Sequence, residues 1–248
     1  MDKENEKIKE DENVKLNNNI EEDEEEIERK EYEKQRKDKR FKTICWTLFI
    51  IAVLIYLSTY IASNMFLKPI IYLYPEEETS LVVKLGSPEK LTCTYPKYKE
   101  TGWDVTAFPD GTLIDNETGR KLYSLYWEGK DNKNIEFNEG FCVKGEDTIK
   151  FLEEKLEVLG LTEREAEEFI VYWLPKMENN KYNLIRFATM EEIENNMPIE
   201  FSVEPDTVIR VLMQFKPVNR YVEIPEQVIE TPERTGFVAV EWGGTEVK

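Results

Sequence analysis

One segment of this chain carries no charge over a length that constrains its environment. Between Lys42 and Lys68 lie 25 consecutive residues without Asp, Glu, Lys or Arg. As an α-helix, such a segment extends roughly 37 Å, against a bilayer hydrocarbon core of about 30 Å. The apolar core of a cleaved signal peptide is shorter, at about 7–15 residues, and a buried helix rarely avoids charge for so long. We therefore predict one retained transmembrane helix at residues 44–66, with the lipid bilayer as its partner.

The charges beside this segment predict its orientation. Residues 34–42 carry six Lys or Arg and one Asp, whereas Lys68 stands alone before Glu76, Glu77 and Glu78. The positive-inside rule places the basic side in the cytoplasm. We expect a single-pass membrane protein with a cytoplasmic N-terminus and an extracytoplasmic C-terminal domain.

Residues 1–43 differ in composition from the rest of the chain. Residues 1–33 hold 15 acidic and 6 basic residues, and large apolar residues are nearly lacking. Such a segment cannot bury enough apolar surface to offset the entropy of ordering the chain. We expect an acidic, mostly disordered cytoplasmic tail that ends in a basic cluster at residues 34–42. An acidic interaction tail is the alternative.

Residues 69–248 show the pattern of one folded domain, with strands before and after a helical pair. Short runs rich in β-branched and aromatic residues are separated by turn residues such as Pro109-Asp110-Gly111, which is typical of strands. This order predicts an α+β domain with a mainly antiparallel sheet and an inserted helical pair. The predicted strands are Ile70–Tyr74, Ser80–Leu85, Leu91–Tyr95, Trp103–Phe108, Leu122–Trp127, Gly140–Lys144, Tyr182–Phe187, Ile199–Val203, Val208–Phe215 and Phe237–Trp242.

The helical pair is predicted from apolar periodicity and from its ends. The first helix covers about Asp147–Leu159. The second begins with Thr162-Glu163-Arg164-Glu165, which fits a capping box, and Pro175 is expected to bend or end it. A third, short helix is predicted at Met190–Asn195.

The composition excludes several classes of site. The chain has no histidine, which removes Ser-His-Asp and Cys-His catalysis and the H-E-x-x-H zinc motif. Three cysteines, of which Cys45 lies in the charge-free segment, do not suffice for a thiolate zinc site. Residues 69–248 hold 35 acidic and 20 basic residues, a net charge of −15, which argues against nucleic acid as a partner. We expect no metal and no cofactor.

Two motifs, W-E-G and E-W-G-G, place Glu128 beside Trp127 and Glu241 beside Trp242. Two carboxylates across an aromatic-walled cleft could hydrolyse a glycosidic bond if they lie about 5–9.5 Å apart. Without hydrolysis, the two indoles could stack against a sugar. In the alternative interpretation, the indoles fill the core and the glutamates are surface residues at strand ends.

Two cysteines, Cys93 and Cys142, lie in the predicted extracytoplasmic domain and are candidates for a disulfide. A bond between them would close a loop of about 50 residues, worth up to roughly 4 kcal/mol. Strand alternation places Cys93 on the apolar face of its strand. It places Cys142 on the face opposite the apolar residues of its own strand. The pattern therefore leaves a disulfide and two free thiols as alternatives.

Long motifs spread over the domain resemble those of a family of uncharacterised, mostly bacterial proteins. The resemblance covers nearly all of residues 68–248, leaves residues 1–67 outside, and implies one intact domain without implying an activity. The motifs run from K-P-x-I-Y-L-Y-P to E-R-x-G-F and E-W-G-G, and they are Lys68–Pro75, Gly102–Ala107, Phe108–Gly111, Tyr126–Gly129, Glu168–Met177, Glu233–Phe237 and Glu241–Gly244.

These observations predict a membrane-tethered extracytoplasmic binding or interaction module with a glycan or a protein as its ligand. The missing histidine, the lack of a nucleophile motif and the aromatic-rich strands favour binding over catalysis. The alternative is an extracytoplasmic glycan hydrolase that acts through Glu128 and Glu241. Placement distinguishes the two, because a hydrolase needs both carboxylates in one cleft, whereas sugar stacking needs Trp127 and Trp242 exposed.

Overall fold

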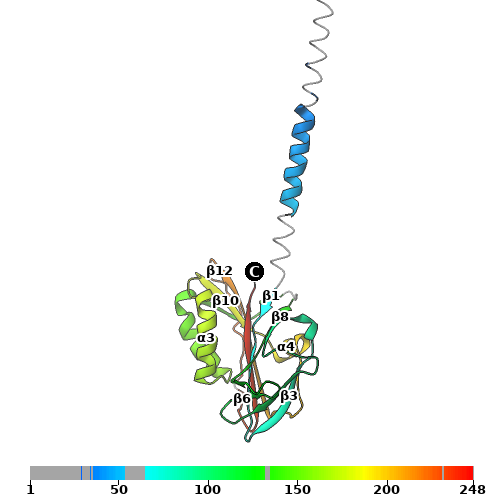
Figure 1. Cartoon of the computed structure of the whole chain (residues 1–248). Coiled ribbons are helices and arrows are strands. Elements are labelled where there is room, and N and C mark those ends of the chain that lie inside the picture. Colours follow the sequence, from blue (N-terminus) through cyan, green and yellow to red (C-terminus); the bar gives the residue numbers. More distant parts are fainter. Residues whose placement is uncertain are drawn as a thin grey trace, which may run out of the picture. The chain divides into compact units, whose positions relative to one another are not determined.

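A computed structural model of the 248-residue chain describes residues 29, 34, 36–53, 65–131, 135–230 and 232–247. The chain divides into two compact units, Met1–Ile61 and Ala62–Lys248, which are described separately. Figure 1 shows a helix in the first unit and the folded domain in the second.

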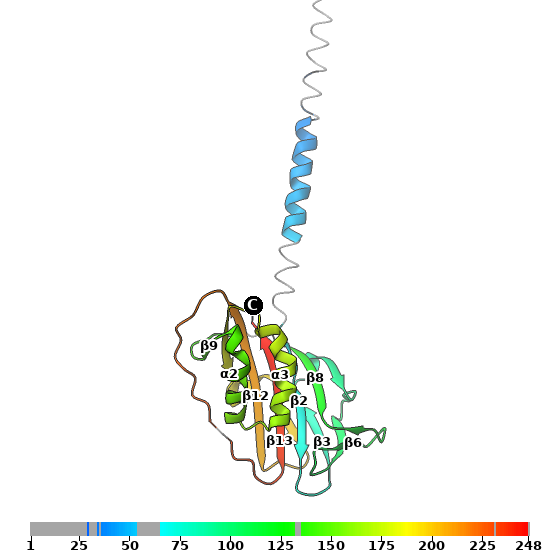
Figure 2. The same cartoon turned by 90° about the vertical axis from the view of Figure 1, so that its left-hand side faces the viewer.

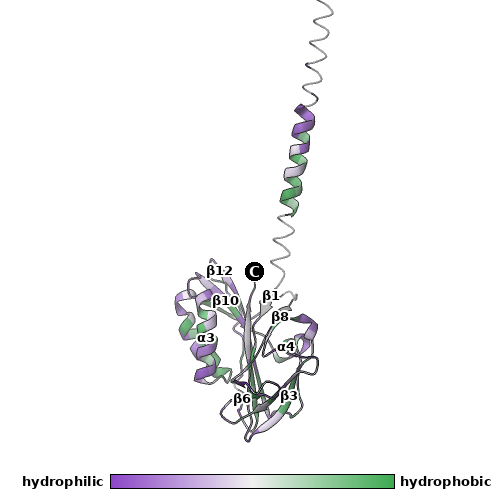
Figure 3. Ribbon diagram, viewed as in Figure 1, coloured by the Kyte–Doolittle hydropathy of each residue, from purple (hydrophilic) through white to green (hydrophobic). Residues whose placement is uncertain are grey.

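The first unit contains a helix over residues 36–53, whose hydropathy changes from hydrophilic to hydrophobic along its length (Figure 3). None of the helices in the described ranges combines the length and apolar character that crossing a bilayer requires. Of the predicted transmembrane segment, residues 44–53 are helical and residues 54–64 lie outside the described residues. Its predicted end is wrong, because Met65 and Phe66 belong to a strand. The predicted disorder of residues 1–28 also falls outside the described residues.

The second unit is built on a large sheet, here called sheet A, with the strand order β1-β8-β2-β13-β12-β10-β9 and with β4 also paired to β8. Every pair is antiparallel except β12 with β13. Its strands are β1 (Met65–Leu67), β2 (Ile70–Tyr74), β4 (Leu91–Tyr95), β8 (Leu125–Asp131), β9 (Phe141–Lys144), β10 (Tyr182–Phe187), β12 (Thr207–Val218) and β13 (Val238–Glu246).

A smaller antiparallel sheet, sheet B, has the strand order β11-β3-β5-β6-β7. Its strands are β11 (Ile199–Phe201), β3 (Thr79–Leu85), β5 (Trp103–Ala107), β6 (Leu113–Asp115) and β7 (Lys121–Leu122). The predicted strand Leu122–Trp127 is therefore two strands in two sheets, separated by a bend at Tyr123.

Two helices, α2 (Thr148–Val158) and α3 (Glu163–Met177), cover one face of sheet A (Figure 2). They enclose a core that includes Leu152, Phe169 and Trp242. The predicted capping box at the start of α3 is formed, and α3 continues through Pro175 to Met177. Two single-turn 3-10 helices, Pro88–Lys90 and Gly145–Asp147, complete the connections.

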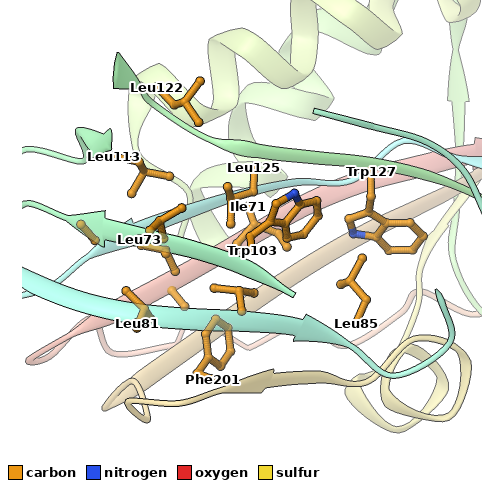
Figure 4. Close-up of a cluster of buried hydrophobic side chains, with 14 of the residues drawn as sticks. Ile71, Leu73, Leu81, Leu85, Trp103, Leu113, Leu122, Leu125, Trp127 and Phe201 are labelled. Atoms are coloured by element: carbon orange, nitrogen blue, oxygen red, sulfur yellow. The ribbon is translucent and has the colours of Figure 1, made fainter. Parts of the chain in front are cut away.

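The opposite face of sheet A packs against sheet B and against the short helix α4 (Met190–Asn196). Strand alternation divides the residues of β2, so that Tyr72 faces the helices and Ile71 and Leu73 face sheet B. Figure 4 shows Ile71, Leu125 and Trp127 in this second core. The predicted α+β class, the mainly antiparallel pairing and the helical pair are confirmed, while the second sheet and the parallel pair were not predicted.

Candidate functional site

The two tryptophans proposed for ligand stacking are buried. Trp127 is 2% exposed and lies between the sheets, whereas Trp242 is 1% exposed and lies beneath α3. The ring centroids of Trp242 and Phe169 are 5.4 Å apart with the rings nearly perpendicular. Neither indole offers a face to a sugar, so the stacking interpretation is wrong. The alternative interpretation is correct for the two indoles, which fill the core, and wrong for Glu241, which is buried and not a surface residue.

Glu241 is a buried ion-pair partner. Its Oε2 accepts a hydrogen bond from Arg210 Nε at 2.7 Å, and its Oε1 accepts one from Trp127 Nε1 at 2.9 Å. Arg210 stands directly opposite Glu241 on the neighbouring strand and also donates to Glu194 Oε1 at 2.6 Å and to the Met197 carbonyl at 2.8 Å. This cluster, here called the Arg210 cluster, joins sheet A to α4.

Glu128 lies on the other face of sheet A. Trp127 and Glu241 share a face because their side chains are hydrogen-bonded, and Glu128 follows Trp127 in the same strand, so it points the opposite way. Its carboxylate accepts a hydrogen bond from Tyr126 at 3.2 Å. The catalytic pair of the hydrolase alternative is therefore wrong, because the sheet separates the two carboxylates.

The two candidate cysteines are free, with Cys93 exposed and Cys142 half-buried. Cys93 lies on β4 and Cys142 on β9, six strand spacings apart in sheet A. At about 4.8 Å per strand this is roughly 29 Å, whereas a disulfide needs its Cα atoms within about 7 Å. The structure therefore supports two free thiols over the candidate disulfide.

A pocket of about 780 Å³ lies where β2, the β5–β6 turn, β7 and the start of α3 meet. We call it the tyrosine–arginine pocket, from the side chains that line it. Its aromatic and charged lining residues are Tyr72, Tyr74, Tyr123, Lys121, Arg164, Arg234 and Asp110.

Three of the sequence motifs that carry the family resemblance meet at this pocket. Tyr72 and Tyr74 come from the first motif, Pro109-Asp110-Gly111 from the turn after β5, and Arg234 from the segment before β13. Gly111 has a φ of 80°, and a Cβ there would lie 2.6 Å from the Tyr74 ring. Glycine therefore allows the turn to lie directly against that ring. The motifs were evident in the sequence, but their convergence was not.

The aromatic wall of the pocket consists of three tyrosines. The Tyr72 and Tyr74 rings are parallel with centroids 6.3 Å apart, and Tyr123 lies 6.4 Å from Tyr72. Tyr72 is buried, and its hydroxyl donates to Glu168 Oε2 at 2.6 Å and accepts from Trp242 Nε1 at 3.1 Å. Tyr123 is 51% exposed and offers the accessible aromatic surface.

Burial and nearby carboxylates keep two of these phenols protonated. For Tyr72, burial, followed by the hydrogen bond to Glu168, raises the pKa well above its usual value near 10. For Tyr74, burial, followed by the charge and hydrogen bond of Glu165, raises the pKa. Both phenols stay neutral hydrogen-bonding groups at physiological pH.

The arginines of the pocket are already paired with glutamates. Arg234 contacts both oxygens of the buried Glu165, at 3.0 and 3.3 Å, and Arg164 Nε donates to Glu168 at 3.2 Å. Their guanidinium carbons lie 5.5 Å from the Tyr74 centroid and 5.6 Å from the Tyr123 centroid, respectively. These pairs hold planar polar groups beside aromatic rings without a large excess of positive charge.

The arrangement is suited to binding. Aromatic surface with a few fixed polar groups is the usual lining of a ligand pocket. Within the ranges that the structure describes, no three His, Cys, Asp or Glu side chains are grouped so as to hold a metal ion.

No family model matches the chain, and no solved structure matches it. The chain is similar to the "Uncharacterized protein in bglA 3'region" of Butyrivibrio fibrisolvens, with 38% identity over 65 residues. That match covers 25% of this chain and 66% of the other protein, which is just under two thirds of its length.

Proposed function

We propose that this chain is a membrane-tethered extracytoplasmic binding module and that a glycan binds in its tyrosine–arginine pocket. The observation that carries the proposal is the half-exposed Tyr123 beside Arg164 in a pocket of about 780 Å³. A sugar ring presents C–H groups that pack against an aromatic face, and its hydroxyls bond to planar polar side chains. The sequence predicted a glycan as a possible ligand and placed it on Trp127 and Trp242. The present proposal keeps the glycan and places it on Tyr123.

The charges in the pocket favour a neutral glycan over an anion. Three cations, Lys121, Arg164 and Arg234, line the pocket beside the carboxylate of Asp110. The two arginines are neutralised by Glu165 and Glu168 directly behind them. Little unpaired positive charge is left to attract an anionic ligand.

The tether rests on the charge-free residues 43–67 and on the exposed apolar side chains of the described helix. Trp46, Leu48 and Phe49 are each at least 60% exposed in the isolated chain. Placing such side chains in lipid would remove them from water. Deleting residues 44–61, which leaves β1 in place, should release the expressed protein from the membrane pellet after alkaline carbonate extraction. Full retention of the deletion variant in the pellet would contradict the tether.

Binding is tested by titrating the full chain with a panel of neutral oligosaccharides in a detergent that has no sugar headgroup. Tyr123→Ala should weaken binding by up to about tenfold, because a contact with an aromatic ring is worth about 0.5–1.5 kcal/mol. Tyr221→Ala is the matched control, since Tyr221 is also more than half exposed but lies outside the pocket. The proposal fails if no oligosaccharide binds or if both variants bind as the parent does.

A further inference from the structure

A second cavity, of about 550 Å³, opens on the face of sheet A that α2 and α3 leave uncovered. Its wall includes Arg186 of β10 and Gln214 of β12, which stand directly opposite each other in the antiparallel register. Ala188 and Leu212 supply apolar surface next to them. We call this the β10–β12 cavity, and it shares no lining residue with the tyrosine–arginine pocket.

Arg186 and Gln214 are buried but incompletely hydrogen-bonded. Arg186 is 8% exposed and Gln214 is 6% exposed. Neither Arg186 Nε nor Gln214 Oε1 has a hydrogen-bond partner among the residues that the structure describes. Buried polar atoms are nearly always paired, and an exception requires an explanation such as a bound water, an ion or a functional role.

The remaining nitrogens of Arg186 are held in place. Nη2 donates to Glu192 Oε2 at 2.6 Å, and Nη1 donates to the Glu136 carbonyl at 3.4 Å. These contacts fix the guanidinium plane and leave Nε as the one nitrogen of Arg186 without a partner among the described residues. A donor and an acceptor without partners thus lie buried on adjacent strands within the same wall.

The two free atoms and the charge around them define the ligand chemistry. A group that satisfies both must accept from Arg186 and donate to Gln214. A carboxylate cannot donate and an ammonium cannot accept, whereas one hydroxyl can do both. Among the lining residues that the structure describes, the carboxylates of Glu136, Glu139 and Glu192 outnumber the one arginine, so they disfavour an anion.

We propose that the β10–β12 cavity is a second binding site, which takes a neutral polyhydroxylated compound, a free sugar or polyol, by one of its hydroxyls. Its volume falls in the range of small-molecule pockets. Neutral amides of Asn138 and Asn196 line it and suit further hydroxyls. The site rests on its own residues and does not require the tyrosine–arginine pocket to bind a glycan.

The test uses the full chain in a glycerol-free buffer and a detergent that has no sugar headgroup. The probes are neutral hexoses and pentoses, the uronates of the same hexoses, and acetamide, each titrated by NMR. We expect one or more neutral sugars to bind, with the matching uronate at least tenfold weaker. Binding of no sugar, equal binding of sugar and uronate, or binding of acetamide alone would overturn the proposal.

Gln214→Met removes the free acceptor and keeps a side chain of similar length. It should weaken sugar binding at least tenfold without lowering the melting temperature, because it breaks no hydrogen bond of Oε1. The matched control is Gln227→Met, since Gln227 is equally buried but bonds both the N–H and the carbonyl of Phe187. The control should lower the melting temperature and leave affinity within twofold.

Two further outcomes separate this site from the tyrosine–arginine pocket. If sugar binding is lost in Tyr123→Ala and unchanged in Gln214→Met, only the present proposal is overturned. If it is lost in Gln214→Met and unchanged in Tyr123→Ala, the present proposal is supported and the tyrosine–arginine pocket fails.

Discussion

Two buried arginines on one face of sheet A have opposite surroundings. Arg210 and Arg186 both stand opposite a polar residue of the next strand, Glu241 and Gln214 respectively. Arg210 donates to two carboxylates and a carbonyl within 2.8 Å. Arg186 keeps a free Nε beside a cavity. The hydrogen bonds of Arg210 are therefore made within the protein, whereas Arg186 has hydrogen-bonding capacity left for a ligand.

The difference shows how similar residues take different roles in one sheet. A buried charge must be compensated, and in the Arg210 cluster the sequence supplies all the partners. Burial disfavours the charge of Arg210, but Glu241 and Glu194 hold its pKa above the usual value. An unsatisfied group costs stability, so its presence near a cavity points to function more strongly than a satisfied one does.

The largest expected effect on stability comes from removing a negative charge from the Arg210 cluster. Glu241→Gln leaves Arg210 buried without its main counter-charge and should destabilise the domain by about 3–5 kcal/mol. Urea unfolding followed by tryptophan fluorescence measures this loss. Glu194→Gln is the control, since that carboxylate is 45% exposed and its loss should cost less than about 1 kcal/mol. A cost below about 1 kcal/mol for Glu241→Gln would contradict the assigned role.

A second prediction compares two buried glutamines. Gln227→Met should cost about 2 kcal/mol, because it leaves the Phe187 N–H and carbonyl without their partner. Gln214→Met should be neutral or stabilise by about 1 kcal/mol, because it removes an acceptor that has no partner in the described chain. The same urea unfolding experiment compares them. Equal losses in both variants would show that the β10–β12 cavity is as closed as the Arg210 cluster.

A third prediction concerns the hydroxyl of Tyr72 at the tyrosine–arginine pocket, which makes two hydrogen bonds within the protein. Tyr72→Phe should cost about 2 kcal/mol at pH 8, because it leaves Trp242 Nε1 buried without an acceptor. The folded-state pKa of Tyr72 is raised, so the parent's stability from this group is complete below pH 10. Above pH 10 only the unfolded tyrosine ionises, so the parent loses about 1.4 kcal/mol per pH unit from this group.

Unfolding at pH 8 and at pH 11 measures the consequence for Tyr72. The difference between parent and Tyr72→Phe should shrink as the pH rises. Tyr221→Phe, at an exposed position, is the control and should differ little from the parent at either pH. A difference that is constant or grows with pH would rule out a raised pKa for Tyr72.

Local sequence patterns predicted the elements of this domain better than its sites. Capping residues and apolar periodicity predicted α3, and alternation predicted strands such as β10, because both signals are local. The W-E-G motif did not show that Trp127 and Glu128 lie on opposite faces of sheet A. One face packs against sheet B, and α2 and α3 cover the other. Pairing Glu241 with Arg210 depends on a parallel β12–β13 contact, which no local pattern encodes.

The smallest expected effect on stability is at acidic pH and concerns the ion pair between Arg186 and Glu192. Burial opposes ionisation of Glu192, but hydrogen bonds from Arg186 and Thr189 hold its pKa below 4.5. Its contribution to stability is therefore present above pH 4.5 and is lost as the pH falls through the lowered folded-state value. Because the Glu192 side chain is 46% exposed, the loss should be under about 1 kcal/mol. Glu192→Gln should flatten the decline of stability as the pH falls below 4.5, whereas Glu191→Gln at a neighbouring exposed position should not. Identical acid profiles for the two variants would mean that Arg186 gains nothing from its carboxylate partner, and the guanidinium would then have no fixed orientation toward the β10–β12 cavity.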